Sequence, residues 1–446
     1  MARLSIKTNY ALLAFFLIST LRAWAQEPNI RDSVQNVNTN FHFQLTTVTQ
    51  HKFSMHAPYT GANSLTGARE DASTLTATIF WGQKLWKNAA IYINPEVAGG
   101  SGVSGAHGIA GFTNGEAFRV GNPSPTIYLA RAFFQQTIGL SNEVGNVGEG
   151  ANDVYKDKST HYLDIVLGKF SVADYFDKNS YSHDPRSQFL NWSLMSNGGW
   201  DYPANVRGYT WGGVVEYGSP AFSFRIASVM VPTEANGNVM DRKILQANSS
   251  MIEFEKPFQI NNRPGAVRLL SFFTQTHMGN YQQAVQQNPN DPDITSTRQY
   301  GRTKYGFGVN LEQELASGIG MFARASWNDG HNETWAFTEI DRSASIGVLL
   351  DGSLWKRGDD AFGFGTVLNG LSTYHRDYLA AGGYGFIIGD GQLNYGKEWI
   401  TEAFYKANLF SETFFVTPHY QFVWNPAYNN DRGPASVLGL RVHVEF

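Results

Sequence analysis

No cysteine occurs in the 446 residues of this chain. Its absence excludes a disulfide framework and a thiol nucleophile. It also disfavours a structural zinc site, because such sites are built largely from cysteine thiolates. Stability must then come from another source, and a hydrogen-bonded sheet that closes on itself and leaves no free edge would provide it.

Long apolar runs are also missing, since no stretch after residue 25 approaches the roughly 18 apolar residues of a membrane-spanning helix. The single apolar run, residues 11–21, is too short to span a bilayer. It follows two basic residues and precedes Ala23-Trp24-Ala25, a small-x-small cleavage site. We therefore expect residues 1–25 to be a signal peptide. Residues 26–40 are polar and unpatterned, and we expect them to form a short periplasmic lead-in.

The chain has no excess of positive charge. It contains 34 Lys and Arg against 38 Asp and Glu. Without the three basic residues of the expected signal peptide, 31 basic side chains face 38 acidic ones, a net charge of −7. That balance disfavours nucleic-acid and anionic-lipid partners.

Enzyme motifs are absent too, with no GxSxG, HExxH or phosphate-binding loop. Asp177 with Asp184, or Glu339 with Asp341, could be imagined as a glycosidase pair, but paired carboxylates on strands more often serve as lumen charges or loop ligands. The acidic stretch 288–293 has two prolines and no glycine, unlike a regular calcium loop. We expect no catalysis, no metal and no cofactor.

Glycine and aromatic residues, in contrast, are plentiful, with 45 Gly and 14% Phe, Trp and Tyr. In the last nine residues, every even position from Leu438 to Phe446 is apolar, whereas the odd positions are Gly439, Arg441, His443 and Glu445. This spacing predicts a strand with one apolar and one polar face. An exported chain ending in such a strand is typical of outer-membrane barrels, and we expect the barrel-assembly machinery to recognise Phe446.

About sixteen segments show such alternation, although it is weak in 248–256 and 265–275. They begin near residues 41, 73, 90, 127, 161, 207, 221, 248, 265, 303, 319, 344, 360, 398, 412 and 436. Short connections such as Lys87-Asn88 contrast with long ones, namely 99–125, 137–160, 171–206 and 276–302. Short turns at one end and long loops at the other are typical of membrane barrels. We predict an all-β fold, an antiparallel transmembrane up-and-down β-barrel of about 16 strands over residues 41–446, with long extracellular loops and outer-membrane lipid around its apolar face.

The polar faces of these strands would line the lumen and carry charges of both signs, among them Glu96, Arg131, Arg324, Glu402 and Arg441. A hydrated wall of mixed charge suits neutral, hydroxyl-rich solutes, whereas an anion-selective pore would need a dominant ring of Lys and Arg. A second interpretation is that the charges only hydrate the lumen and brace one another across strands. In the segment 127–136, the alternation places Arg131 on the polar face and Tyr128 on the apolar face.

Two loops are candidates for contact with a solute. The loop 171–206 mixes polar groups with aromatic rings, which could hold a sugar through its hydroxyls and its flat C–H faces; the residues singled out are Asp174, Asp177, Arg186, Asn191 and Trp192. An ordered loop packed by its own aromatic side chains is an equal alternative. The glycine-rich loop 99–125 could instead fold inward and bring Glu116 and Arg119 to the path.

Several segments resemble the carbohydrate-selective porins of Gram-negative outer membranes. They include 58–65 (PYTGANSL), 167–170 (LGKF), 184–186 (DPR), 327–330 (WNDG), 338–342 (TEIDR), 389–395 (GDGQLNY) and 431–434 (DRGP), in order along nearly the whole mature chain. The resemblance implies a sixteen-stranded barrel that passes sugars by diffusion, with charged residues at a constriction. On matching positions it assigns this role to Glu96, Arg131, Lys169 and Arg324, followed by Glu339 and Asp341.

The sequence therefore predicts a porin of the Gram-negative outer membrane that passes small neutral carbohydrates by passive or facilitated diffusion. A non-conducting sugar-binding or adhesin barrel is the alternative. No interface can be read from the sequence, so both a homotrimer and a monomer stay open.

Overall fold

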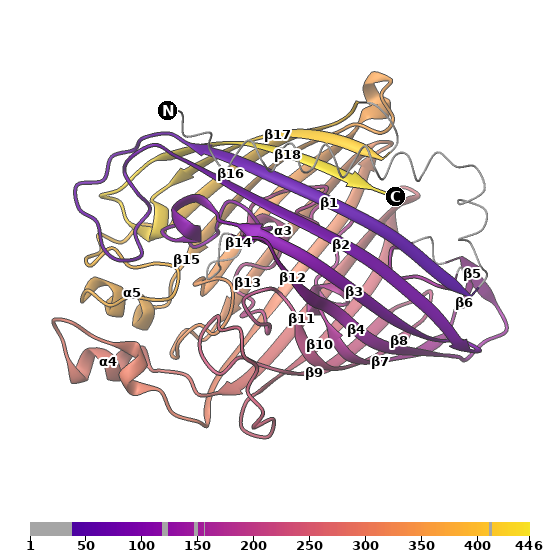
Figure 1. The fold of residues 1–446 in the computed structure, drawn as a ribbon, viewed down its shortest axis with the longest axis horizontal. Helices are drawn as coiled ribbons and strands as arrows, with labels where there is room; N and C mark the ends of the chain where they lie inside the picture. The colour runs from indigo at the N-terminus through magenta and orange to yellow at the C-terminus, as the bar shows by residue number, and fades with distance from the viewer. Residues whose placement is uncertain (1–37, 118–123, 147–149, 156, 410–412) are drawn as a thin grey trace.

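The computed structural model describes residues 38–117, 124–146, 150–155, 157–409 and 413–446. The expected signal peptide, most of the lead-in and Arg119 lie outside these residues. Sixteen strands form one closed barrel in which every neighbouring pair is antiparallel (Figure 1). The strands are β1 (Thr39–Lys52), β2 (Glu70–Trp86), β3 (Ala89–Gly100), β4 (Thr126–Gly139), β7 (Tyr162–Phe170), β8 (Thr210–Gly218), β9 (Ser223–Met230), β10 (Asn248–Ile260), β11 (Arg263–Thr276), β12 (Arg302–Ala316), β13 (Ile319–Asn328), β14 (Arg342–Asp351), β15 (Ala361–Gly370), β16 (Glu398–Asn408), β17 (Phe414–Trp424) and β18 (Ala435–Glu445). The predicted fold class is confirmed.

The last strand closes the barrel against the first. β18 pairs with β1 over nine residue pairs, from Gln44 with Glu445 to Lys52 with Val437. Phe446 continues this pairing, because its backbone exchanges hydrogen bonds with Phe43 and the two rings lie 5.3 Å apart. On β18, Leu438 and Leu440 are each 46% exposed, whereas Arg441 is fully buried. The apolar face therefore points outward and the polar face into the barrel.

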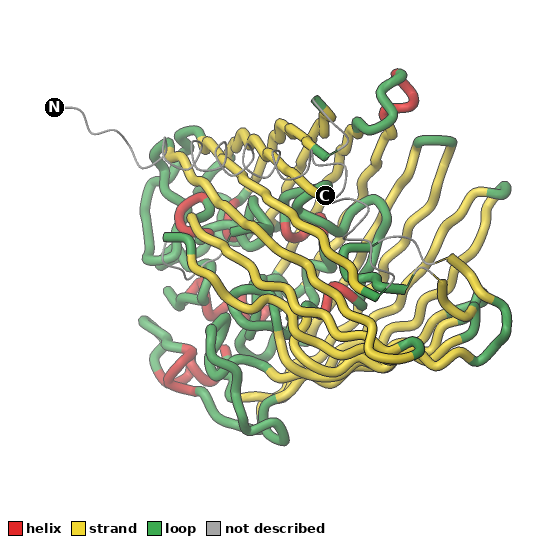
Figure 2. The backbone as a smooth tube through the Cα atoms, turned by 45° about the vertical axis from the view of Figure 1, so that its right-hand side comes forward, coloured by secondary structure: helices red, strands yellow, loops and turns green. Residues whose placement is uncertain are grey.

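Helices and long loops gather at one end of the barrel (Figures 1 and 2). Within the described ranges, the helices are α3 (Trp192–Met195), α4 (Tyr281–Gln287) and α5 (Thr373–Ala380), and the 3₁₀ turns are η1 (Val103–Ala106), η2 (Val172–Asp174), η3 (Ile294–Thr297), η4 (Gly352–Trp355) and η5 (Pro426–Tyr428). Only η4 belongs to a connection at the opposite end, where Lys87–Asn88 and 317–318 also turn the chain. No helix among the described residues is long and apolar enough to cross a membrane.

The expected long loop 137–160 does not lie at the long-loop end. It joins the fourth and fifth strands of the barrel, β4 and β7, and therefore leaves from the same end as the turn Lys87–Asn88. Within it, β5 (Val144–Asn146) and β6 (Asp157–Ser159) form a separate two-stranded sheet. The prediction from loop length was wrong here. In an up-and-down barrel, connections that follow odd-numbered strands of the barrel lie at one end and those that follow even-numbered strands lie at the other.

A bulge in β4 overturns the expected direction of one side chain. Asn94 pairs with Arg131 and Pro95 with Leu129, so Ala130 is left over in the ladder. Pro95 has no N–H to donate, which makes an interruption at this position inexpensive. The bulge reverses the alternation, and Tyr128 turns inward to donate its hydroxyl to Glu96 rather than facing lipid.

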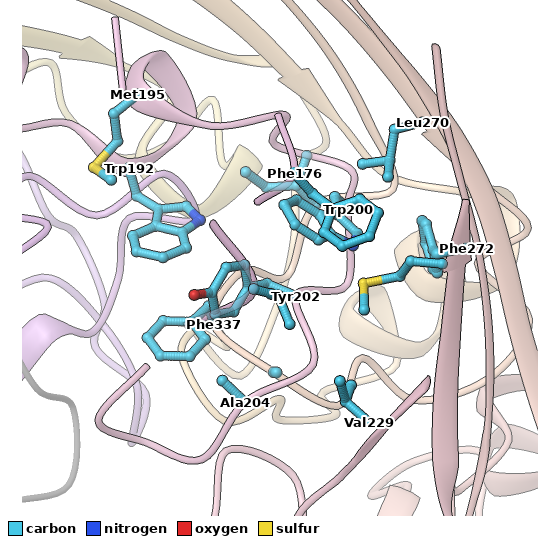
Figure 3. Close-up of a cluster of buried hydrophobic side chains, with 14 of the residues drawn as sticks. Phe176, Trp192, Met195, Trp200, Tyr202, Ala204, Val229, Leu270, Phe272 and Phe337 are labelled. Carbon is cyan, nitrogen blue, oxygen red and sulfur yellow. The ribbon is translucent and has the colours of Figure 1, made fainter. Parts of the chain in front are cut away.

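The weak alternation of β10 and β11 has a structural cause. Their inner faces carry the apolar side chains Met251, Leu270 and Phe272, all buried. Side chains from loops inside the barrel cover this part of the wall, as Figure 3 shows for Phe176 and Trp200. Both faces of these strands are therefore apolar in places, and the period-two signal fades.

Candidate constriction and solute path

The loop 171–209 between β7 and β8 folds into the lumen and is held there by charged side chains of the wall. The Glu402 carboxylate accepts the backbone N–H groups of Leu190 and Asn191, each at 2.9 Å. Arg441 donates to the carbonyls of Pro185 and Gln188 at 2.8 and 2.6 Å. Glu402 and Arg441 thus anchor the segment 185–191 and are fully buried, although the sequence predicted both as pore-lining.

Arg324 anchors the next part of the same loop. Its guanidinium donates to Asp177 Oδ1 at 3.1 Å and to the carbonyls of Ser182 and Leu194 at 2.6 and 3.1 Å. Asp177 also accepts the backbone N–H of Asn197 at 2.8 Å. Both predicted residues are almost fully buried, so they fix the loop and do not face the path.

Residues 101–117, the part of the loop 101–125 that precedes its undescribed residues, also lie inside the barrel, in agreement with the inward folding considered for this loop. The Glu398 carboxylate accepts the N–H groups of Ala110 and Gly111 at 2.9 Å. Gln50 and Gln421, from two other strands, donate to the carbonyl of Thr113 at 2.9 and 2.8 Å. The two inserted loops contact each other, since Asn191 donates to the Gly111 carbonyl at 2.5 Å.

Five charged side chains and two tyrosines meet where these loops approach β3 and β4. We call them the Glu96 cluster: Glu96, Glu116, Arg131, Asp174, Arg186, Tyr128 and Tyr209. Arg186 donates to Glu96 at 2.9 Å and to Glu116 at 3.2 Å. Glu96 also accepts the hydroxyls of Tyr128 and Tyr209, so one carboxylate of the wall holds two groups from the loop 171–209 and one from β4.

The second ion pair of the cluster is the most accessible part of it. Arg131 and Asp174 form a bidentate pair at 2.6 and 2.7 Å, and their side chains are 13% and 28% exposed. The Arg131 guanidinium lies over the Tyr209 ring, 5.2 Å from its centre. Burial lowers the pKa of Arg186, but the carboxylates of Glu116 and Glu96 raise it by a larger amount, so the pKa lies well above its ordinary value. Its charge is therefore permanent.

Asn191 and Trp192, predicted as sugar contacts, are buried in loop packing. Asn191 is fully buried and caps α3 by accepting the N–H of Ser193. Trp192 stacks on Phe337 at 4.8 Å and on Phe112 at 5.3 Å. Figure 3 shows this indole among aromatic rings of the same and neighbouring loops. The alternative, a loop packed by its own aromatic side chains, describes this part of the chain.

Glu339 and Asp341 bind loops together at the long-loop end. Glu339 accepts the N–H groups of Ile387 and Ile388 at 2.7 and 2.9 Å. Asp341 contacts His375 at 3.1 Å, and Lys304 lies 3.7 Å away. Burial raises the pKa of Asp341, but His375 and Lys304 lower it by a larger amount, so the pKa lies below its ordinary value. Neither carboxylate is accessible to a solute, since both are almost fully buried.

Lys169 lies on the outer face of the wall, contrary to its predicted position on the path. It is opposite Trp211, which is 43% exposed, in the β7–β8 ladder. Directly opposed residues of an antiparallel pair share one face. Its Nζ donates to the carbonyl of Leu129 at 2.7 Å, beside the β4 bulge.

A ladder of ion pairs lies along the inner wall of β8 to β12, of the kind expected if wall charges brace one another across strands, although the sequence did not identify most of its members. Arg225 contacts Glu216, Glu253 and Glu255, and Arg268 contacts Glu255 and Glu312. The period-two spacing of Glu253 and Glu255 was available as a signal, but apolar inward neighbours obscured it. Among the described residues, no group of three His, Cys, Asp or Glu could hold a metal ion.

Comparison with protein families and with solved structures shows what this barrel is similar to. The model of the carbohydrate-selective porin, OprB family matches residues 82–446. The high-pH structure of Pseudomonas putida OprB has a TM-score of 0.70 at 16% identity, covering 95% of this chain and 97% of that one. The low-pH structure of the same protein has a TM-score of 0.51 at 13% identity, covering 94% and 95%. The channel DcaP of Acinetobacter baumannii has a TM-score of 0.50 at 8% identity, covering 92% and 97%.

These structural similarities, at low identity, establish the fold. A search of curated protein sequences found no match. The family model, in contrast, covers far more than half of the chain, including fourteen complete strands of the barrel and the whole loop 101–125. The chain therefore belongs to the carbohydrate-selective porin, OprB family, the sugar porins of the Gram-negative outer membrane.

Proposed function

We propose that small neutral sugars diffuse through the lumen past the Glu96 cluster, and that Arg131, Asp174 and Arg186 are the side chains they contact. The observation that carries this proposal is the position of Glu96, which holds Arg186 from one loop and Tyr209 from the other end of that loop against the barrel wall. The charges stand in pairs, so they present donors and acceptors to sugar hydroxyls without a strong field of one sign.

The chemistry of the accessible groups fits a polyol. The Arg131–Asp174 pair offers a planar donor beside an acceptor. The centre of the Tyr128 ring lies 6.2 Å from that of Tyr209, the ring beneath Arg131, and the Arg207 guanidinium lies over the face of Tyr128 at 4.1 Å. Contacts of this kind are weak individually, which a channel requires, because a solute that bound tightly would not leave.

The test is single-channel conductance of the mature protein in a planar bilayer, titrated with glucose and with a short oligosaccharide. We expect stable open steps whose current falls as sugar enters. R131Q and D174N should weaken this sugar block, and E143Q, at an exposed position near the opposite end, should not. A correctly folded barrel without conductance would contradict the proposal and favour the non-conducting sugar-binding or adhesin alternative.

Several coarser expectations accompany this proposal. We infer that the protein has no catalytic activity, as the family consists of channels.

Removal of residues 1–25 on export would leave Gln26 at the N-terminus, which mass spectrometry of the mature chain would test. Truncation of Phe446, which packs on Phe43, should slow assembly into the outer membrane. Native mass spectrometry would distinguish a monomer from a homotrimer.

A further inference from the structure

Lys169 is a charged side chain on a surface that faces lipid. It shares that face with Trp211 and with Leu167, which are 43% and 54% exposed. Its Nζ donates to the Leu129 carbonyl, and no carboxylate among the described residues forms an ion pair with it. A cation on the lipid face of a barrel is destabilising near the bilayer centre and tolerated near the interface. Lys169 lies at the end of β7 from which a long loop leaves, which is the extracellular end.

A second basic group lies at the same end, three strands away. The run Arg242-Lys243-Ile244-Leu245-Gln246 precedes β10, and all five residues are exposed, Leu245 at 88%. The run is held in place by Asp241, which accepts the Tyr300 hydroxyl and the Lys243 N–H, each at 2.8 Å. An ordered rim that presents two cations next to bare aliphatic side chains is suited to the boundary between head groups and acyl chains.

A hollow of about 480 Å³ lies on the outer face of β8 to β11, below these two basic groups. Its floor is formed by Gly213, Ser228 and Ser250, which are opposite one another in register across three strands. Larger apolar side chains border this floor: Val215, Ile226, Ile252 and Phe273.

Register connects the hollow to both basic groups. Gly213 is opposite Leu167, two residues before Lys169. Ser250 is the third residue of β10, four residues after Gln246, the last residue of the exposed run. With neighbouring strands about 4.8 Å apart, β7 and β10 are separated by roughly 14 Å. The two sets of cations therefore flank the upper end of one apolar depression.

We propose that this surface binds a diphosphorylated, multiply acylated lipid of the outer leaflet, with an acyl chain in the hollow and its phosphates against Lys169 and the Arg242–Lys243 pair. Charge complementarity favours this occupant over a second copy of the chain, which would need to bring acidic groups to both cation sites at once. The negative net charge of the whole chain does not oppose it, because charges more than about 8 Å away are screened at physiological ionic strength. On this proposal, the expectation from net charge that anionic lipids are disfavoured does not hold at this surface.

Native mass spectrometry of the full mature protein in detergent, with defined lipids added, tests the proposal. Diphosphoryl lipid A should be retained as one bound copy, and dephosphorylated lipid A and phosphatidylethanolamine should be retained less. K169Q, R242Q and K243Q should each weaken binding about fivefold, as expected for one cation at a charged membrane surface. S228F with S250F, which fills the hollow, should weaken retention of the phosphorylated and the dephosphorylated lipid alike.

R376Q is the matched control, since Arg376 is an accessible cation on α5, above the β15–β16 side of the barrel. Heat-modifiable migration and unchanged sugar block would show that each variant is folded and conducting, which separates this proposal from the proposed function. Equal lipid retention by the wild type and the triple cation variant would overturn the proposal. An equal loss of lipid retention in R376Q would also overturn it, and so would displacement of the lipid by inorganic phosphate alone. The same holds if the wild type forms an oligomer without lipid and S228F with S250F abolishes that oligomer.

Discussion

Arg186 Nη2 lies 2.9 Å from Glu96 Oε2, and this contact joins the loop inside the lumen to the barrel wall across 90 positions of sequence. Glu96 is only 2% exposed. It therefore acts by positioning the arginine and the two tyrosines around it, while Arg131, Asp174 and Arg186 are the groups that we propose a solute contacts.

Replacing Glu96 by Gln should reduce sugar binding in the channel. The amide keeps the size of the side chain but removes the charge that faces Arg186, and breaking one buried ion pair typically costs about 3–5 kcal/mol. Glu116 retains part of the pairing, so we expect a displaced arginine and a weaker sugar block in a folded barrel. Sugar-dependent single-channel current measures this, with E143Q as control. An unchanged sugar affinity in E96Q would contradict the positioning role.

Loss of the loop anchors should open the lumen. In E402Q and R441M, the segment 185–191 loses hydrogen bonds to its backbone, so we expect a higher conductance, more current noise and less sugar block. E445Q is the control, because Glu445 lies on the same inner face of β18 but is 47% exposed. If E402Q and R441M conduct like the wild type, the carboxylate and the guanidinium are dispensable as anchors.

Truncation of Trp192 should loosen the inserted loop without unfolding the barrel. The indole is stacked between Phe337 and Phe112, and deleting a buried aromatic side chain typically costs about 3–5 kcal/mol. Hydrogen exchange of residues 171–209 should therefore accelerate in W192A and largely recover in W192F, while heat-modifiable migration stays normal. Equal exchange in W192A and the wild type would show that the aromatic packing does not hold this loop.

The Asp341–His375 contact should make the loops at the long-loop end of the barrel sensitive to acid. Because the pKa of Asp341 in the fold is below its ordinary value of 3.8, its charged form stabilises the fold above that value. The contribution is lost as the pH falls through the folded pKa. At pH 7, D341N should accelerate hydrogen exchange in residues 371–397, at a cost of about 1–3 kcal/mol for the unpaired partners. D377N, at an exposed position on α5, is the control. The difference between D341N and the wild type should shrink below pH 4, and a constant difference would contradict the ion-pair role.

Alternating polarity determined the barrel from the sequence. Side-chain direction in a strand repeats every two residues, so apolar runs such as Leu438 and Leu440 opposite Arg441 are legible without tertiary information. This local rule located about sixteen strands. It failed where a local feature broke the period, as at the β4 bulge beside Pro95, and it faded in β10 and β11, where loop side chains cover the inner face.

The candidate site, in contrast, depended on contacts that no local pattern encodes. The alternation of polar and apolar residues could not distinguish a side chain that faces water from one that a loop covers. It did assign these charged residues correctly to the inner face: Glu96, Arg131, Arg324, Glu402 and Arg441. Glu402 bonds to residues more than 200 positions away, and Lys169 faces outward because the ladder pairs it with Trp211.

The sequence by itself therefore determined the wall of this porin, since each strand carries its own two faces. Only the tertiary structure decided which wall charges anchor the inserted loops, because the buried hydrogen bonds that hold these loops join segments far apart in the sequence.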